Sequence, residues 1–394
     1  MVLLGLVGYY FLVPASNGTS GGIISGFKGF FPFGGSGGEN SNQVSTTTNQ
    51  NNTKTPQTPE NFNLKLRKLS KEPVSGAGTL DIKAGTVVRY IEKATGHIYE
   101  VELFSPQHNR ISNTTIPVVY DAIWGNKNNS LVARYLKDDN QTVDTYSLTV
   151  KATSTSTENT ISGIAFPGGI SDVSVFDTNI FYLQQGVNTS SGYISSFDGT
   201  KKKMIWNSDI KELLSQFVNT KTVALTTKPA QNVPGFLYFV DTTTGAVKKI
   251  LGNISGLSTS VSPDATKVLY LIEGNGDLMY LLDTTTKTST VTTPTTSPEK
   301  CVWSKKDKTV IYCAVPRNPI GGDSLTLWYK GFQSFSDDIW KYDIKNNTAS
   351  IVENLSSDAG ESIDVIKPIL SDSEQYLVFM NKTDNSLWSL DLTK

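Results

Sequence analysis

Histidine and cysteine, which often serve in catalysis and metal binding, are rare in this sequence. The 394 residues include two histidines, His97 and His108, so a His-dependent triad would have to use one of them. His97 follows a glycine at a predicted hairpin turn, His108 lies in a predicted loop, and no nucleophile motif accompanies either residue. The sequence contains no GxxxxGK(S/T) phosphate-binding loop and no HExxH zinc motif. We therefore expect both histidines to be solvated polar residues.

Two short segments match functional motifs, but each lacks the context that the chemistry requires. Residues 34–38 fit the G-x-S-x-G nucleophile pattern, although no strand precedes them and no helix follows. Residues 138–142 start like a calcium-binding loop, but the glycine at its sixth position and the glutamate at its twelfth are missing. We expect a linker and a hairpin turn, respectively. The sequence thus assigns no catalytic, cofactor-binding or metal-ligating residue, and we predict that the chain is not an enzyme.

Cys301 and Cys313 flank a predicted hairpin whose turn is centred near Lys306 and Asp307. Because the two cysteines lie about equally far from that turn, we expect them to face one another across the strands. A zinc site would need more ligands than two cysteines and two distant histidines supply. A cross-strand disulfide in an oxidising compartment and two reduced, packed cysteines are both compatible with this pattern.

The charge balance argues against a nucleic-acid partner. Lys and Arg number 35 and Asp and Glu 36, which leaves a net charge of −1 and no overall field toward polyanions. The lysine clusters at 201–203 and 248–249 are short and fall on predicted outer strands, where lysine discourages edge-to-edge pairing. Charged residues make up only 18%, and Asn, Thr, Ser and Gly are abundant, which is common in extracytoplasmic β proteins.

The elements that position these residues are short strands in a repeated pattern. In residues 257–291, four runs rich in β-branched and aromatic residues alternate with turns of Pro, Asp, Gly, Asn and Thr, which predicts a four-stranded antiparallel meander. Its third strand ends in the pattern apolar, aromatic, any, apolar, Asp. This signature or a weaker form of it occurs at 98–102, 145–149, 194–198, 237–241, 279–283, 339–343 and 387–391. Successive copies lie 42 to 60 residues apart, which predicts seven propeller-like units.

The first hairpin of each unit carries a second signature. Ser262-Pro263-Asp264 has counterparts at 123–126, 303–307 and 370–373. Together with the third-strand pattern, these turns resemble those of the TolB-like and WD-repeat-like bacterial β-propellers, over roughly residues 61–394. The resemblance implies an all-β, seven-bladed β-propeller of four-stranded antiparallel blades, a fold that hosts many unrelated functions. The whole chain also looks like membrane-anchored bacterial propellers.

The two ends of the repeat predict how the ring closes. The seventh unit ends with its third strand at 386–392, which leaves it without a fourth. Residues 64–69 precede the first complete unit and alternate between apolar and polar as a strand does. We expect this N-terminal strand to pair with the C-terminal one and close the ring, because closure removes an exposed sheet edge.

The first 60 residues differ from the rest. Residues 1–13 are an apolar run too short for a hydrocarbon core of roughly 30 Å, and they lack the positive n-region of a signal peptide. We interpret residues 1–14 as a truncated membrane anchor and residues 15–60, rich in Gly, Ser, Asn and Thr, as a flexible, disordered linker. The aromatic island at 27–33 is a candidate for contact with the bilayer interface. Residues 61–394 form the propeller.

One unit contains an insertion. The interval from Asp283 to Asp343 is 60 residues, against 42 to 49 elsewhere, and the excess lies between a strand ending near 315 and one starting near 338. Prolines and glycines at 316–322 interrupt the strand pattern. The aromatic residues that follow either plug one end of the channel or form a partner-binding surface, since Trp, Tyr and Arg dominate interface hot spots. The candidate partner-binding residues are Arg317, Trp328, Tyr329, Phe332 and Phe335.

Two functions from different classes fit these observations. The first is a non-catalytic binding or scaffolding propeller for a protein or cell-envelope partner, held outside the cell by a single-pass membrane anchor. The second is a glycan-active lyase or hydrolase that uses carboxylates and tyrosines at the propeller channel. We favour the first because it requires no missing motif. A pocket with clustered carboxylates of mutually perturbed pKa would favour the second.

Overall fold

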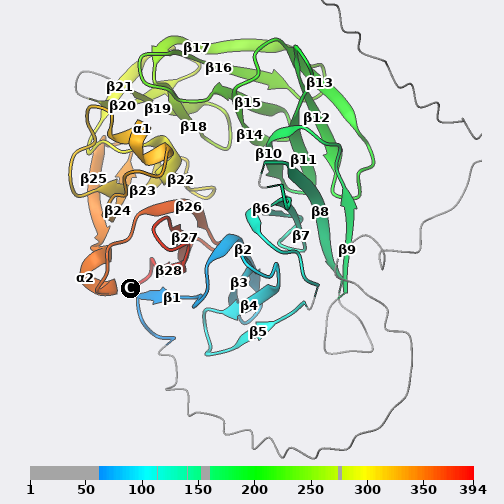
Figure 1. Ribbon diagram of the computed structural model, residues 1–394. Helices are drawn as coiled ribbons and strands as arrows, with labels where there is room; N and C mark the ends of the chain where they lie inside the picture. The colour runs from blue at the N-terminus through cyan, green and yellow to red at the C-terminus, as the bar shows by residue number, and fades with distance from the viewer. Residues whose placement is uncertain (1–61, 113, 140, 152–159, 274–276) are drawn as a thin grey trace, which may run out of the picture. The chain divides into compact units, whose positions relative to one another are not determined.

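The computed structural model describes residues 62–394 except 113, 140, 152–159 and 274–276. The described residues belong to one compact unit of the chain, Asn52–Lys394. That unit contains seven antiparallel sheets of four strands each, which follow one another around a ring (Figure 1). The predicted all-β, seven-bladed propeller of four-stranded blades is therefore confirmed. The predicted anchor at 1–14 and linker at 15–60 lie outside the described residues, and no helix within those residues has the length and apolar character to cross a membrane.

Six blades are formed by consecutive strands. The first three are β2 (Val74–Ile82), β3 (Gly85–Glu92), β4 (Ile98–Glu102) and β5 (His108–Arg110); β6 (Val119–Gly125), β7 (Ser130–Leu136), β8 (Val143–Lys151) and β9 (Thr160–Ala165); and β10 (Ile170–Phe176), β11 (Asn179–Gln185), β12 (Ser190–Ser196) and β13 (Lys203–Ser208). The next three are β14 (Leu213–Asn219), β15 (Thr222–Thr227), β16 (Pro234–Asp241) and β17 (Val247–Ser255); β18 (Ser258–Val261), β19 (Lys267–Ile272), β20 (Leu278–Asp283) and β21 (Ser289–Thr292); and β22 (Cys301–Trp303), β23 (Val310–Pro316), β24 (Asp337–Asp343) and β25 (Thr348–Glu353). In each of these blades the first strand lies nearest the centre of the ring (Figure 1).

The seventh blade combines both ends of the described chain. It contains β26 (Val365–Leu370), β27 (Tyr376–Asn381), β28 (Leu387–Asp391) and, in the outer position, β1 (Leu66–Lys68). The antiparallel register places Leu66 opposite Leu390 and Lys68 opposite Trp388. Leu66 and Leu390 are both buried, so the pairing also contributes apolar packing to this blade.

The core of each blade lies along its second strand. Four central residues of β11, β15 and β19 are buried in each case. A second strand has a neighbour on either side within its sheet and an adjacent blade on each face, which explains its continuous apolar sequence. The outer strands differ: β17 begins with three exposed residues, two of which are Lys248 and Lys249. This position confirms that the pair Lys248 and Lys249 lies on an outer strand. The prediction for 201–203 is wrong in part, because β13 begins at Lys203, and Lys201 and Lys202 precede it in the turn after β12.

The third-strand signature falls on the third strand of six blades, and in the third blade it begins on β12 and ends two residues after it. Asp283 shows why the pattern ends in aspartate. Its Oδ1 accepts hydrogen bonds from the backbone N–H groups of Thr285 (2.8 Å) and Thr286 (2.9 Å), while its Oδ2 lies 2.6 Å from Lys267 Nζ. The hydrogen bond from Lys267, followed by those from the turn, lowers the pKa of Asp283. An aspartate at this place forms an Asx turn that ends one strand and starts the next.

The predicted insertion lies in the sixth blade. The chain leaves β23 at Pro316 and enters β24 at Asp337, and between them it forms the short helix α1 (Ser324–Tyr329). Two further short helices flank this blade and the next, the 3-10 turn η2 (Pro298–Lys300) and α2 (Leu355–Ala359). Since consecutive strands in a blade are antiparallel, the insertion and the β22–β23 turn lie at opposite ends of the strands.

Candidate functional site

Cys301 and Cys313 form a disulfide bond between β22 and β23, with their Cα atoms 4.0 Å apart. They are direct partners in the antiparallel register, as the position of the predicted turn indicated. Of the two alternatives that the sequence left open, the structure has the cross-strand disulfide. Trp303 and Leu325 belong to the same buried cluster, so the bond lies in the core of the sixth blade.

The insertion places two of its candidate partner-binding residues in the core. Trp328 is 5% exposed and Phe335 is 7% exposed, and their rings stack with centroids 6.2 Å apart. The indole Nε1 of Trp328 also donates a hydrogen bond to Asp364 Oδ2 at 2.8 Å. These two aromatics therefore fix the insertion to the propeller.

The other three candidates lie at the surface. Phe332 is 81% exposed and Tyr329 is 37% exposed, although the hydroxyl of Tyr329 reaches inward and donates a hydrogen bond to Glu299 at 2.7 Å. Burial raises the pKa of Glu299, and burial together with the nearby Glu299 raises that of Tyr329 well above its ordinary value. Arg317 lies 2.9 Å from Asp338 through its Nη2 and also contacts Asn354. Partner binding by this group remains a prediction.

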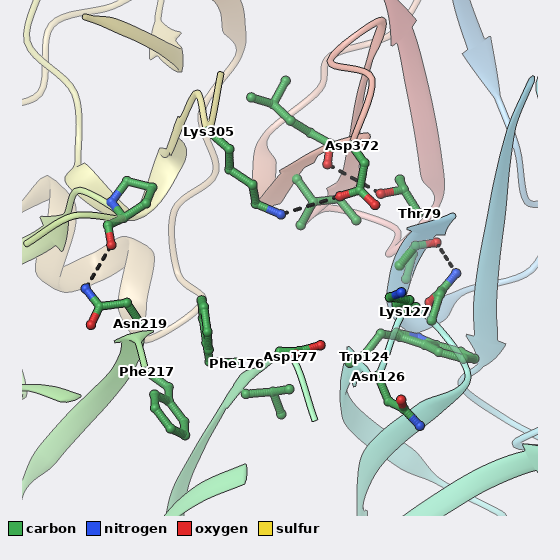
Figure 2. Close-up of a pocket in the computed structure, with 18 of the residues that line it drawn as sticks. Thr79, Trp124, Asn126, Lys127, Phe176, Asp177, Phe217, Asn219, Lys305 and Asp372 are labelled. Atoms are coloured by element: carbon green, nitrogen blue, oxygen red, sulfur yellow. Dashed lines mark hydrogen bonds and ion pairs between the residues drawn. The ribbon is translucent and has the colours of Figure 1, made fainter. Parts of the chain in front are cut away.

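A second candidate site lies at one end of the central channel, where the pocket has a volume of about 720 Å³ (Figure 2). Ligand pockets in proteins commonly have volumes of this order. All seven blades contribute to its lining. The lining residues that carry the chemistry are Trp124, Asn126, Lys127, Asn128, Phe176, Asp177, Phe217, Asn219, Lys305 and Asp372. We call this the channel-mouth pocket.

The turn from β6 to β7 gives the channel-mouth pocket its most constrained segment. Asn126, Lys127 and Asn128 have φ values of 51°, 49° and 61°, so three successive non-glycine residues adopt the left-handed conformation. This conformation costs free energy at each residue and is retained only where surrounding contacts enforce it. Here the backbone N–H of Asn126 donates to the carbonyl oxygen of Asp177 at 2.6 Å, and the side chain of Asn128 donates to Gly78 at 2.9 Å.

The close approach of neighbouring blades explains the residue before this turn. A Cβ atom on Gly125 would lie 2.4 Å from a methyl group of Val175, in the next blade. Only glycine leaves room for that contact. The turn is therefore held from both sides, and its polar side chains are presented at a defined place on the rim.

The remaining walls of the pocket combine charged, amide and aromatic groups. Lys305 and Asp372, from neighbouring blades, form an exposed ion pair at 3.6 Å, and Asn219 donates a hydrogen bond to the carbonyl oxygen of Pro263 at 2.9 Å (Figure 2). The rings of Phe176 and Phe217 pack with centroids 5.8 Å apart. Amide groups can exchange hydrogen bonds with a peptide or a sugar, and aromatic faces can pack on either, so this surface is chemically suited to binding.

The two histidines are placed apart from this pocket, and neither belongs to its lining. His108 is exposed on β5 with its Nε2 2.8 Å from the hydroxyl of Tyr90, and Nε2 of His97 lies 3.3 Å from Thr115 Oγ1. Within the part of the chain that the structure describes, no group of three or more His, Cys, Asp and Glu side chains is arranged to hold a metal ion.

Sequence reasoning located the turns of the channel-mouth pocket but not the pocket itself. The sequence predicts first-hairpin turns at 123–126, 303–307 and 370–373, and residues of all three line this pocket. The available signal was that all such turns in a closed propeller lie at the same end of their strands. From the positions of these turns alone, Trp124, Lys305 and Asp372 are therefore expected at the same end of the channel, where the structure places them.

Comparison with known proteins supports the fold. No protein-family model matches the chain, and no curated protein matches its sequence. Among solved structures, an oligogalacturonate lyase in complex with manganese is similar, with a TM-score of 0.50 and 12% identity over 83% of this chain and 100% of that one. Also similar are an oligogalacturonate lyase from Vibrio parahaemolyticus (0.48, 11%, 81% and 98%) and TolB from Acinetobacter baumannii (0.42, 13%, 80% and 78%).

At these identities the likeness concerns the fold alone. The chain is a seven-bladed β-propeller whose structural neighbours include TolB and oligogalacturonate lyase. What it binds has to be argued from its own residues.

Proposed function

We propose that this chain is a non-catalytic binding or scaffolding propeller that holds a partner protein at its channel-mouth pocket. The observation that carries the proposal is the convergence of all seven blades on one pocket of about 720 Å³. A rigid rim of short turns is a common place for recognition, because the scaffold fixes the turns while their side chains vary.

The composition of the rim supports a peptide segment as the bound group. The amide groups of Asn126 and Asn219 each donate one hydrogen bond within the propeller, which leaves a second N–H of each for a peptide carbonyl group. Trp124 offers an aromatic surface to apolar side chains. Lys127 and Asp177 add both signs of charge, which favours a partner segment with complementary charges of its own. The left-handed turn at 126–128 is already ordered, so less conformational entropy is lost on binding.

The proposal includes the setting of the propeller. The apolar run at 1–13 and the linker composition at 15–60 support a membrane anchor with the propeller on its outer side, facing protein or cell-envelope partners. The disulfide between Cys301 and Cys313 is in keeping with an oxidising compartment. The pairing of β1 with β28 supports closure of the ring by the N-terminal strand, which keeps the rim rigid.

Pull-down from intact cells tests the site, with the full chain as bait and two variants compared. In the first, Lys127→Glu and Asp177→Lys exchange the charges at the channel mouth. In the matched control, Lys330→Glu changes an exposed lysine beside α1, at the other end of the strands. We expect the captured partner to be lost with the first variant and retained with the second. Loss with Lys330→Glu alone would assign binding to the insertion and overturn the channel-mouth site.

A second candidate function is glycan cleavage, because Asp177 and Asp372 place two carboxylates at the same pocket. Incubation of the full chain with oligogalacturonate, with ultraviolet detection of a new C=C bond and a reducing-end assay, distinguishes the two functions. Product formation that is lost in Asp177→Asn would favour the enzyme. We expect no product.

A further inference from the structure

A lysine and two aspartates are buried together beneath the insertion of the sixth blade. Lys300, Asp337 and Asp364 each have side chains that are 0% exposed. Nζ of Lys300 lies 2.6 Å from Asp337 Oδ2 and 2.5 Å from Asp364 Oδ1, and it donates a third hydrogen bond to the carbonyl oxygen of Val365 at 3.2 Å. Removing three charged groups from water costs free energy that a surface ion pair does not have to offset. The burial of this cluster therefore suggests that it has a specific role.

The insertion covers this cluster with aromatic rings. Nζ of Lys300 lies 5.2 Å from the ring centroid of Trp328 and 5.3 Å from that of Phe335. Both rings are buried, so they shield the amine and the carboxylates from solvent. In such a site, a reaction that releases water is not opposed by bulk water, and the reacting groups are already held together.

The two carboxylates have different surroundings. Asp364 accepts hydrogen bonds from Trp328 Nε1 at 2.8 Å and from the backbone N–H of Phe335 at 3.0 Å, both on Oδ2. These donors leave its Oδ1 directed at the amine of Lys300, 2.5 Å away, where it can take up a proton. Asp337 Oδ2 accepts a hydrogen bond from the backbone N–H of Val365 at 2.7 Å, whereas its Oδ1 is buried and has no hydrogen-bond partner among the described residues.

Asp337 is also the carboxyl group that is more easily protonated. Burial raises its pKa to about 6, and the nearby Lys300 opposes that shift. A protonated carboxyl carbon is more open to attack by an amine than a carboxylate is. The raised pKa makes the neutral carboxyl form of Asp337 easier to reach. In that form Oδ1, which accepts no hydrogen bond, can leave as part of a water molecule, while Oδ2 stays hydrogen-bonded to the N–H of Val365.

We propose that Lys300 and Asp337 condense into an intramolecular isopeptide bond, with Asp364 as the proton acceptor. The ammonium group of Lys300 gives one proton to Asp364, and the neutral amine attacks Cγ of protonated Asp337. The C–N bond forms, the C–Oδ1 bond breaks, and a second amine proton joins the departing hydroxyl to release water. The N–H of Val365 stabilises the negative charge that develops on Oδ2. The products are one amide, one water molecule and protonated Asp364, so no oxidant or other co-reactant is needed.

The bond would join the start of β22 to the start of β24. Between these positions lie the β22–β23 hairpin, with its disulfide Cys301–Cys313, and the insertion with α1. The amide would thus enclose the insertion in a covalent loop and hold Trp328 over the cluster. Unlike the disulfide, it would resist reduction.

Mass spectrometry of the purified full chain, reduced and denatured, tests the proposal directly. We expect an intact mass lower by one water molecule than the sequence requires. Proteolysis should yield a branched peptide that contains both Lys300 and Asp337, and trypsin should not cleave after Lys300. A folded wild-type chain that retains the full sequence mass overturns the proposal. A branch between Lys300 and Asp364 would overturn the roles assigned to the two aspartates.

Variants test the roles of the three groups. Lys300→Met removes the nucleophile and Asp364→Asn removes the proton acceptor. We therefore expect the intact mass of each variant to equal the mass that its sequence requires, with no water molecule lost. The matched control is Lys228→Met, which removes a lysine that is paired with Glu212 but is exposed, and it should keep the branched peptide. Circular dichroism shows whether each variant folds. If Asp364→Asn folds and still forms the branch at the wild-type rate, Asp364 is not the proton acceptor.

Discussion

Trp328 and Asp364 are joined by a hydrogen bond of 2.8 Å between the indole Nε1 and Oδ2, and both residues are buried. Trp328 lies on α1 in the insertion of the sixth blade, whereas Asp364 immediately precedes β26 in the seventh. The bond therefore connects two blades through a segment that is absent from the other blades. The candidate residues of the insertion thus fall into two groups: Trp328 and Phe335 are buried and support the fold, whereas Phe332 faces solvent.

The first prediction uses this separation. Replacing Trp328 with alanine should lower the free energy of unfolding by about 3–5 kcal/mol, because it leaves a cavity and removes a donor from a buried carboxylate. Phe332→Ala is the control: Phe332 is 81% exposed, and its loss should change stability by less than about 0.5 kcal/mol. Denaturant unfolding of the full chain measures both. Equal losses of stability would contradict the assignment of Trp328 to the core and of Phe332 to the surface.

The second prediction concerns the ends of the chain. Leu66 is 6% exposed and lies opposite Leu390, so Leu66→Glu places a charge in the seventh blade and should destabilise the propeller by on the order of 3 kcal/mol. Leu64, two residues earlier, is 52% exposed, and Leu64→Glu should have little effect.

Deletion of residues 1–60 should likewise leave a folded propeller, whereas deletion of 1–75 should not. Equal melting temperatures for the two deletions would contradict ring closure by β1.

Much of the fold could be predicted because its signals are local. Asp283 and its counterparts bond their own turns, and the buried second strands appear in the sequence as short apolar runs. Even the pairing of Cys301 with Cys313 follows from the position of one hairpin turn. Each of these features depends on residues within a single blade, where sequence spacing determines distance.

The candidate sites could not be predicted in the same way, because they depend on distances between blades. Lys300 belongs to the segment Pro-Glu-Lys, which has the composition of a solvent-exposed turn, yet its side chain is fully buried. Its partners Asp337 and Asp364 follow 37 and 64 residues later, beyond an insertion whose path has no repeat to define it. The channel mouth likewise joins Asn126 to residues of six other blades.

The third prediction is a pH dependence due to Asp172, whose carboxylate lies between β10 and β14. Burial raises its pKa to about 6, against the hydrogen bonds that Ser215 donates to it. The unfolded value is about 3.9, so between roughly pH 4 and pH 6 the folded state binds more protons than the unfolded state. The free energy of unfolding contributed by this group therefore falls as the pH rises through that window.

Asp172→Asn should remove this contribution. Relative to the variant, the wild type should gain on the order of 1 kcal/mol of stability when the pH is lowered from 7 to 5. Denaturant unfolding of both proteins across this range measures the difference, and the comparison cancels the effects of other titrating groups. A wild type that loses stability relative to the variant on acidification would show that the pKa of Asp172 is lowered rather than raised.

The last prediction concerns the disulfide. Cys301 and Cys313 are 12 residues apart in sequence, and a bond that closes a short loop in the unfolded chain typically contributes about 2–4 kcal/mol. Reduction of the wild type should lower its melting temperature, and the double variant Cys301→Ala, Cys313→Ala should show the lower value whether or not reductant is present. The amide proposed between Lys300 and Asp337 encloses the same hairpin, so part of the restraint persists when the disulfide is broken. We therefore expect reductant to destabilise Lys300→Met more than the wild type, and an equal loss in the two proteins would show that the two restraints act independently.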